Sequence, residues 1–214
     1  MSIAGNLASV RERIEQAGRN PDDVTVVAVT KGFGAEVCRK ALAAGLHNLG
    51  ENRVQEALPK IAAVGDARWH LIGHLQTNKV AAAVHHFALI QTVDSMRLAE
   101  AIASIEPEMP VLVEVNVARE PQKSGVDPAD APEFIVQVGR MLSIEGLMAM
   151  GPASGDPGPA FAELRRMRDD AQERLAKWLP ILSMGMSGDF EAAVREGSTM
   201  LRLGQVLFGP RPLT

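Results

Sequence analysis

The sequence is poor in cysteine and aromatic residues and has no excess of positive charge. It has one cysteine, no tyrosine, 4% aromatic residues and a formal net charge of −4. The lone cysteine, Cys38, cannot form a disulfide within the chain, and its place on an apolar helical face predicts a small buried side chain. A net negative chain offers no positive surface for a polyanion, so nucleic acid is not expected as a partner.

Long apolar runs are also missing. No run approaches the roughly 20 residues that a membrane-spanning helix needs, so no membrane association is expected. Residues 1–13 lack a continuous apolar segment followed by a small-residue cleavage site, which predicts a cytoplasmic protein. A length of 214 residues suffices to bury a core without disulfides or a structural metal, so we expect a single domain over residues 1–214.

What the sequence does contain is a repeated alternation of short apolar runs, typical of strands, with longer amphipathic segments of helical spacing. Near-continuous apolar strands predict burial on both faces, as in a parallel sheet covered by helices. An open doubly wound sheet and a closed barrel both satisfy this pattern. Eight such units favour an α/β fold of the (β/α)8 TIM-barrel type, with an extra helix at residues 3–17 before the first strand. The strand-like runs are 24–31, 47–51, 69–74, 89–94, 111–117, 144–150, 181–186 and 200–208.

One helical segment shows the expected amphipathic spacing clearly. Five apolar residues follow one another at steps of three and four in the region after residue 160, with charged residues between them. This spacing predicts a helix that lies on the sheet with one apolar stripe facing it. The residues of the stripe are Phe161, Leu164, Met167, Ala171 and Leu175.

Polar residues that end the apolar runs are the first candidates for a functional site, because barrel sites form at the carboxyl ends of the strands. Lys31 ends a very apolar run, 24–30. Desolvation there favours the neutral amine, which is the nucleophilic form that condenses with an aldehyde. The alternative is a strand-end lysine whose ammonium extends to solvent.

A second candidate is an anion site near the end of the chain. Barrels often bind phosphate between the loops that follow strands seven and eight, through backbone amides. Ser187 and Gly188 follow the seventh run and Gly204 lies in the eighth. The alternative is that Ser187 serves only as the N-cap of the next helix.

Histidines offer a weaker candidate. His70 and His74 lie four residues apart in one predicted strand and would point to one face. No cysteine or carboxylate stands at ligand spacing from them, so no metal site is predicted.

Read together, these segments resemble the pyridoxal phosphate homeostasis protein family, which is related to the N-terminal barrel of alanine racemase. The resemblance covers nearly the whole chain. It rests on residues 28–31 (AVTK), 50–56 (GENRVQE), 69–79 (WHLIGHLQTNK), 123–125 (KSG), 145–150 (EGLMAM), 182–187 (LSMGMS), 197–204 (GSTMLRLG) and 208–209 (FG).

The resemblance implies a fold-type-III barrel that binds pyridoxal 5′-phosphate (PLP), with Lys31 carrying PLP as a Schiff base. Ser187 and Gly204 match positions that bind the cofactor phosphate, beside the neighbouring Gly188, and Arg202 matches the residue facing the pyridine nitrogen. Gln205 stands where the family usually has threonine, which leaves its backbone amide available but removes a hydroxyl. Residues expected to line the pocket are Asn52, His74 and Asn116.

A Schiff base serves either catalysis or simple retention of PLP. Racemases with this barrel use a tyrosine from a second domain as an additional acid–base, and this chain has no tyrosine. We therefore expect a PLP carrier without catalytic residues that buffers or delivers the cofactor. A low-activity fold-type-III enzyme, such as an amino-acid racemase, is the alternative, and a barrel that binds another phosphorylated ligand is a third. Apoenzymes that depend on PLP are candidate recipients, and a monomer is expected.

Overall fold

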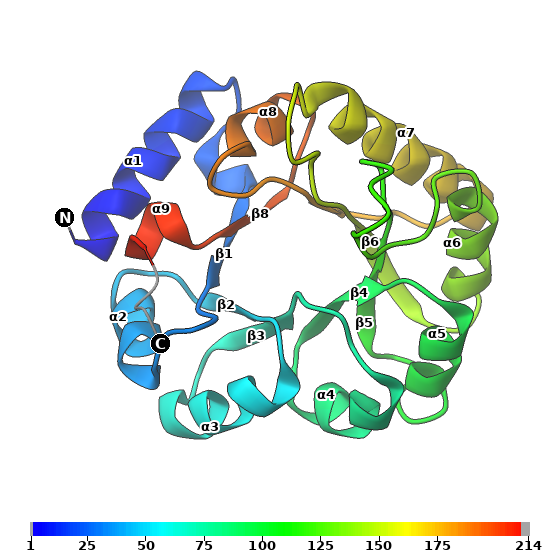
Figure 1. Cartoon of the computed structure of the whole chain (residues 1–214), viewed down its shortest axis with the longest axis horizontal. Helices are drawn as coiled ribbons and strands as arrows, with labels where there is room; N and C mark the ends of the chain where they lie inside the picture. Colours follow the sequence, from blue (N-terminus) through cyan, green and yellow to red (C-terminus); the bar gives the residue numbers. More distant parts are fainter. Residues whose placement is uncertain (1, 211–214) are drawn as a thin grey trace.

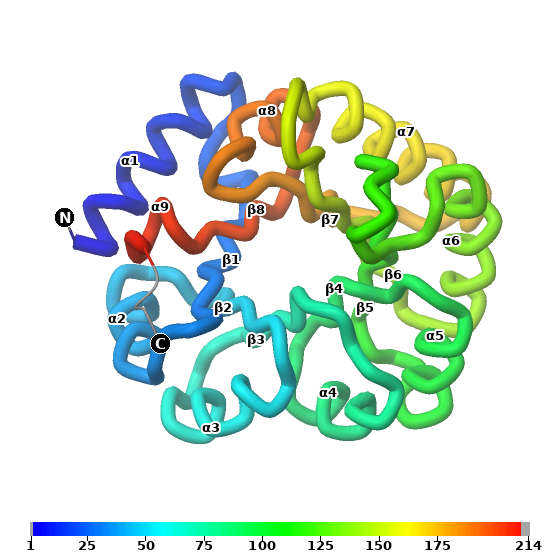
Figure 2. Tube along the Cα trace, in the orientation of Figure 1, coloured from blue at the N-terminus to red at the C-terminus, as the bar shows by residue number. Residues whose placement is uncertain are grey.

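Short parallel strands alternate with helices along the chain in the computed structural model, which describes residues 2–210 (Figure 1). Within these residues, eight strands form a closed barrel in the order of the chain, from β1 to β8. The barrel closes because β8 pairs in parallel with β1, with Thr25 opposite Met200 and Ala28 opposite Leu203. The predicted (β/α)8 barrel is therefore confirmed, and Figure 2 shows its helices as an outer ring.

The strands are three to six residues long. Their bounds are β1 Thr25–Val29, β2 Asn48–Glu51, β3 Arg68–Leu71, β4 Leu89–Val93, β5 Pro110–Glu114, β6 Ser143–Met148, β7 Ile181–Ser183 and β8 Met200–Leu203. The α-helices are α1 Ile3–Gln16, α2 Ala35–Ala43, α3 Val54–Val64, α4 Val80–His86, α5 Met96–Ala103, α6 Ala131–Gly139, α7 Gly158–Leu175, α8 Phe190–Arg195 and α9 Gln205–Phe208, with short 3-10 turns η1 Pro21–Asp23 and η2 Thr77–Lys79.

The last predicted strand, 200–208, is wrong in its second half. The strand β8 ends at Leu203, and the chain then turns into the short helix α9. The turn forms because the Gly204 carbonyl accepts hydrogen bonds from the amides of Leu207 and Phe208, both at 2.9 Å. Apolar residues continue past this point in the sequence, but Gly204 interrupts the run and allows the chain to turn.

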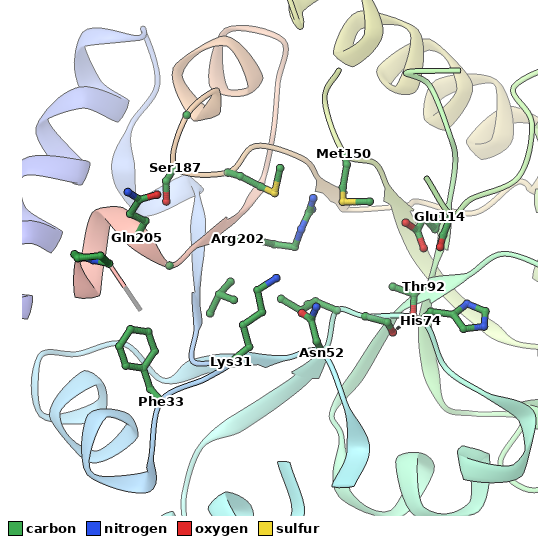
Figure 3. A pocket seen from close by; sticks show the side chains of 18 of the residues that line it. Lys31, Phe33, Asn52, His74, Thr92, Glu114, Met150, Ser187, Arg202 and Gln205 are labelled. Carbon is green, nitrogen blue, oxygen red and sulfur yellow. Dashed lines mark hydrogen bonds between the residues drawn. The ribbon is translucent and has the colours of Figure 1, made fainter. Parts of the chain in front are cut away.

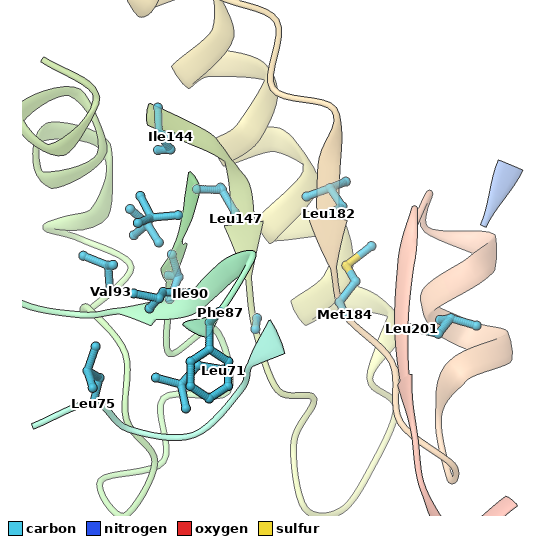
Figure 4. Close-up of a cluster of buried hydrophobic side chains, with 14 of the residues drawn as sticks. Leu71, Leu75, Phe87, Ile90, Val93, Ile144, Leu147, Leu182, Met184 and Leu201 are labelled. Atoms are coloured by element: carbon cyan, nitrogen blue, oxygen red, sulfur yellow. The ribbon is translucent and has the colours of Figure 1, made fainter. Parts of the chain in front are cut away.

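The hydrophobic core has two parts. The larger part lies between the strands and the helices, and Figure 4 shows a section of it with Leu71, Ile90, Leu147 and Leu182. A smaller cluster consists of Val27, Leu89, Leu112, Met148 and Met200, which come from β1, β4, β5, β6 and β8. Because the strands bury both faces, they read as almost continuous apolar runs in the sequence.

The extra helix before the first strand is present as α1, which begins with a cap: the Ser2 hydroxyl accepts a hydrogen bond from the Gly5 amide at 3.1 Å. It packs beside α8 and α9, where the Asn6 side chain donates to the Leu207 carbonyl at 2.8 Å (Figure 1). The first helix thus contacts the last one. Among residues 2–210, no helix combines the length and the apolar character needed to cross a membrane.

Candidate functional site

The carboxyl ends of the strands surround a cavity of about 640 Å³. This volume is in the range of small-molecule and cofactor sites. All residues that the sequence predicted for the site, except Asn116, line this cavity. The lining residues are Val29, Lys31, Phe33, Asn52, Ile72, Gly73, His74, Thr92, Glu114, Ser124, Met150, Met186, Ser187, Gly188, Arg202, Gly204, Gln205, Gly209 and Pro210.

Lys31 follows the end of β1 and projects into the middle of the cavity (Figure 3). The backbone on either side of it is fixed. The Thr30 amide donates to the Gly50 carbonyl at 3.0 Å, and the Thr30 carbonyl accepts from the Phe33 amide at 3.0 Å. Gly32 lies at a φ of +78°, a conformation that side chains rarely adopt, so the chain turns sharply just after the lysine.

A buried ion pair supports the backbone behind Lys31. The Lys60 ammonium on α3 donates to the Thr30 carbonyl at 3.0 Å and to Glu51 Oε1 at 2.6 Å. The Thr30 hydroxyl also donates to Glu51 Oε1, at 2.6 Å. The Glu51 side chain is fully buried and that of Lys60 is 11% exposed. Glu51, which ends the second predicted strand, thus holds the strand end from behind and does not line the cavity.

Ser187, Gly188, Gly204 and Gln205 gather at one end of the cavity, where Figure 3 shows the Ser187 and Gln205 side chains side by side. Gly204 and Gln205 begin the helix α9, so their amides have no acceptor within that helix. A Cβ added at Gly188 would meet nothing within 4 Å, so the backbone there is open to a ligand. This end of the cavity offers hydrogen-bond donors to an anion.

The interpretation of Ser187 as the N-cap of the next helix is wrong. The N-cap of α8 is Asp189, and Ser187 precedes it by two residues. The Ser187 hydroxyl instead accepts a hydrogen bond from the Val206 amide at 3.2 Å, in the first turn of α9. Ser187 therefore ties the loop after β7 to the segment after β8, which brings the two loops of the anion end together.

Arg202 on β8 lies deep in the site and is 5% exposed. One terminal nitrogen of its guanidinium donates to the carbonyl and the hydroxyl of Ser183 at 2.7 and 2.8 Å, and the other donates to the Ala149 carbonyl at 2.8 Å. Burial lowers the Arg202 pKa to about 10, so the group stays charged at neutral pH. It presents only hydrogen-bond donors to a ligand.

Glu114, His74 and Thr92 lie at the end of the cavity opposite Ser187 (Figure 3). Glu114 is 3% exposed, and burial raises its pKa to about 7, with a further contribution from Asp94 that Arg202 partly offsets. His74 lies at the rim, where its Nδ1 is 3.3 Å from Asp94 Oδ2 and its side chain is 58% exposed. The sequence reasoning missed Glu114, although a lone carboxylate within the apolar run 111–117 marks it.

Replacement of Glu114 by glutamine is expected to stabilise the ligand-free protein at high pH. The folded-state pKa of Glu114, about 7, lies above the ordinary glutamate value of 4.5, so the stability from this group is full below pH 4.5 and is lost as the pH rises through 7. Glutamine removes this loss, which amounts to about 3 kcal/mol. Urea unfolding at pH 5 and pH 8 measures it: the gain should appear at pH 8 only.

The exposed Glu36 on α2 offers a matched control, since Glu36→Gln changes the same chemistry away from the cavity. That variant should behave alike at both pH values. An equal effect of Glu114→Gln at pH 5 and pH 8 would mean that the buried carboxyl ionises normally.

Asn52 and Gly73 bring two neighbouring loops into contact at the cavity. A Cβ at residue 73 would lie only 2.4 Å from the Asn52 carbonyl oxygen, so only glycine fits this approach. The Thr92 hydroxyl donates to the Gly73 carbonyl at 2.9 Å and holds the loop in place. His74 follows in this loop, and β3 ends at Leu71, so the interpretation of His70 and His74 as members of one strand is wrong.

Asn116 does not line the cavity, contrary to the expectation from sequence. The strand β5 ends at Glu114, and Asn116 lies two residues further along, in the loop that follows. Its side-chain amide donates to the Glu120 carbonyl at 2.9 Å and the Lys123 carbonyl at 3.4 Å. Asn116 thus shapes the loop that carries Ser124 to the cavity.

The closed barrel, the lysine at its mouth and the donors after β7 and β8 define a barrel of the alanine racemase N-terminal class. The model of the family "Alanine racemase, N-terminal domain" matches residues 2–212. The structure of alanine racemase from Corynebacterium glutamicum shares the fold, with a TM-score of 0.78 at 18% identity over 99% of this chain and 62% of that one.

Two further comparisons narrow the family. The chain is 38% identical to the pyridoxal phosphate homeostasis protein of Pseudomonas aeruginosa, over 98% of this chain and 94% of that protein. The structure of PipY from Synechococcus elongatus with PLP bound has a TM-score of 0.85 at 37% identity, and the match covers 97% of this chain and all of that one. The chain belongs to the family of pyridoxal phosphate homeostasis proteins.

Proposed function

We propose that this protein binds PLP as a Schiff base on Lys31 and serves to buffer or deliver the cofactor. The observation that carries the proposal is that Lys31 and the anion end formed by Ser187, Gly188, Gly204 and Gln205 line one cavity. Membership of a family whose relative PipY was solved with PLP bound supports the same ligand.

The residues present fit this ligand at each end. The amides of Gly204 and Gln205 and the open backbone at Gly188 suit a phosphate. When bound, PLP supplies an aldehyde. The Lys31 amine would add to the aldehyde carbon, its two N–H hydrogens would leave with the carbonyl oxygen as water, and hydrolysis would reverse the step. Reversible capture of this kind is what a carrier requires.

Two features bear on the choice between a carrier and an enzyme. The sequence has no tyrosine to act as the second acid–base that racemases with this barrel use, and Arg202 lies deep in the site, an arrangement that permits an enzyme without requiring one. A charged guanidinium that can only donate stabilises an unprotonated pyridine nitrogen, and this weakens the cofactor as an electron sink. Two residues of the cavity could act as a second acid–base: His74, which lies at the exposed rim beside Asp94, and Glu114, whose pKa burial raises to about 7. A low-activity enzyme such as a racemase is therefore the second candidate.

Borohydride reduction of the PLP-loaded protein tests the covalent link. The imine band should disappear, the mass should rise by one reduced pyridoxyl phosphate group, and peptide mapping should place that group on Lys31. A group found on another lysine would contradict the assignment of the anchor. An unchanged mass would support non-covalent binding of a phosphorylated ligand instead.

Incubation of the loaded protein with single-enantiomer amino acids in deuterated water separates carrier from enzyme. A carrier leaves the Cα hydrogen in place over hours. Rapid exchange of the Cα hydrogen with inversion of the amino acid would show that the protein is a racemase.

We further propose that the protein is cytoplasmic and monomeric and that it consists of one barrel domain. In this proposal it delivers PLP to apoenzymes that depend on this cofactor. Mixing the loaded protein with an apoenzyme should restore that enzyme's activity, and size-exclusion chromatography should give a single monomer peak. Failure to restore activity would limit the role to storage.

A further inference from the structure

A chain of buried polar side chains crosses the barrel interior below the cavity. It begins at Arg202, whose guanidinium donates to Ser183 Oγ at 2.8 Å, and Ser183 Oγ donates to Gln91 Oε1 at 2.6 Å. Gln91 Nε2 then lies 3.0 Å from His70 Nδ1, and His70 Nε2 lies 3.0 Å from Asn48 Oδ1. The five residues come from five different strands, β8, β7, β4, β3 and β2.

The direction of every hydrogen bond in this chain follows from the charge at its upper end. A guanidinium can only donate hydrogen bonds, so the Ser183 hydroxyl accepts one from Arg202 and donates one to the side-chain carbonyl oxygen of Gln91. The Gln91 amide nitrogen therefore donates to His70 Nδ1, and His70 carries its proton on Nε2 towards Asn48. Burial lowers the His70 pKa to about 4, which keeps the ring neutral as this arrangement requires.

Packing of the barrel interior does not require polar side chains at these positions. The smaller hydrophobic cluster, with Val27 of β1, Leu112 of β5 and Met148 of β6, shows that apolar side chains pack together inside this barrel. Gln91, His70 and Ser183 are buried to the same degree, each at most 2% exposed. Buried polar groups cost stability unless all their partners are present. A connected network at the floor of a ligand cavity indicates that it serves the cavity.

We propose that Ser183 and Gln91 are positioning residues that hold the Arg202 guanidinium against the barrel wall, with its remaining donors directed at the ligand. The inference rests on the proposed PLP site and adds to it the groups that fix the contact to the pyridine nitrogen. Without them, Arg202 would be drawn towards Glu114, whose charge acts on it within the same cavity.

Carboxylates near Arg202 compete with Ser183 for its guanidinium. Glu114 and Asp189 attract the guanidinium, and Asp94 acts on Glu114 in turn. Ser183→Ala removes the hydroxyl that accepts one of the three hydrogen bonds from Arg202, while the backbone carbonyls of residues 183 and 149 still accept the other two. The guanidinium then tilts towards Glu114, and its contact with the ring nitrogen of the ligand weakens. The expected result is therefore a change in the chemical shift of the ring nitrogen of the ligand.

The test uses PLP labelled with ¹⁵N in the ring, loaded on the wild type and on the variants Ser183→Ala and Gln91→Met. In both variants the ring-nitrogen chemical shift should move away from the wild-type value, and PLP should dissociate about tenfold faster, as for loss of one hydrogen bond to a charged group. In an Arg202→Met background, Ser183→Ala should change neither quantity, because it acts only through Arg202.

Ser198→Ala is the matched control. Ser198 is also fully buried, and its hydroxyl lies within hydrogen-bond distance of three backbone carbonyls, of which that of Met184 is nearest at 2.7 Å, but it makes no hydrogen bond to Arg202, Ser183 or Gln91. It should lower stability like Ser183→Ala but leave the ring-nitrogen shift and the dissociation rate unchanged. Equal behaviour of the two serine variants would overturn the inference.

A measurement on the wild-type protein tests the proposal even if the variants do not fold. NMR of the ligand-free protein should show His70 as the neutral Nε2–H tautomer with no titration above pH 5. A protonated or Nδ1–H ring would break the proposed chain and overturn it. Absence of any imine band in the wild type would defeat the proposed function as well, whereas a normal band with an unmoved ring nitrogen in the variants defeats this inference alone.

Discussion

Replacement of Lys31 by alanine is expected to abolish the imine band of the PLP-loaded protein completely. The reason is chemical, because only an amine placed in the cavity forms the bond, and alanine has none. The anion end with Gly204 and Gln205 remains, so weak non-covalent binding should persist and be lost on dialysis. Absorption spectra before and after dialysis, with phosphate analysis of the bound fraction, measure both effects.

Two control variants test whether the absorption band needs an amine at residue 31 or only a positive charge there. Lys31→Arg keeps a cation in the cavity but cannot form the bond, so it should lose the band like the alanine variant. Lys40→Ala removes an exposed lysine on α2, which pairs with Glu36 on the surface, and should keep the full band. A band that survives in Lys31→Arg would place the anchor on a different amine.

Replacement of Lys60 by methionine should destabilise the protein by about 3–5 kcal/mol, the usual cost of leaving one half of a buried ion pair unpaired. Glu51 is fully buried, and its Oε2 has no hydrogen-bond partner within residues 2–210. Lys60 is therefore the cation that compensates this carboxylate. Urea unfolding at pH 7 measures the loss, and the Thr30 carbonyl next to Lys31 loses a donor at the same time.

The double variant Lys60→Met with Glu51→Leu should recover most of the lost stability, since no uncompensated charge then remains. As a control, Lys40→Met breaks the exposed pair with Glu36 and should leave the unfolding midpoint unchanged within error. A Lys60 variant as stable as the Lys40 variant would show that the buried pair of Lys60 and Glu51 does not stabilise the folded protein.

The barrel could be predicted from the sequence because its signals are local. Each strand is a short apolar run, and each of the eight predicted runs contains an observed strand or overlaps most of it. The amphipathic stripe after residue 160 is confirmed as the buried face of α7: Phe161, Leu164 and Ala171 are buried, and Met167 and Leu175 pack against the core. Periodicity of this kind reports burial directly.

Contacts between distant segments could not be predicted in the same way. The hydrogen bond that the Val206 amide donates to the Ser187 hydroxyl depends on how two loops meet, and the sequence offered no signal for this contact. Asn116 and Glu114 are two residues apart, and the exact end of β5 decides which of them reaches the cavity. Strand ends are the least certain part of a pattern, and the site is built on strand ends.

Closure of the barrel by β1 against β8 has a consequence for the timing of synthesis. Lys31 is made early and Arg202 late, yet both face one cavity because residues 25–28 pair with residues 200–203. Ribosomes release the chain from its amino end, so a growing polypeptide carries Lys31 long before the strand that closes the barrel beside β1 exists. Cofactor capture is therefore a property of the finished molecule, and a chain that stalls before β8 is translated has no pocket in which to retain it.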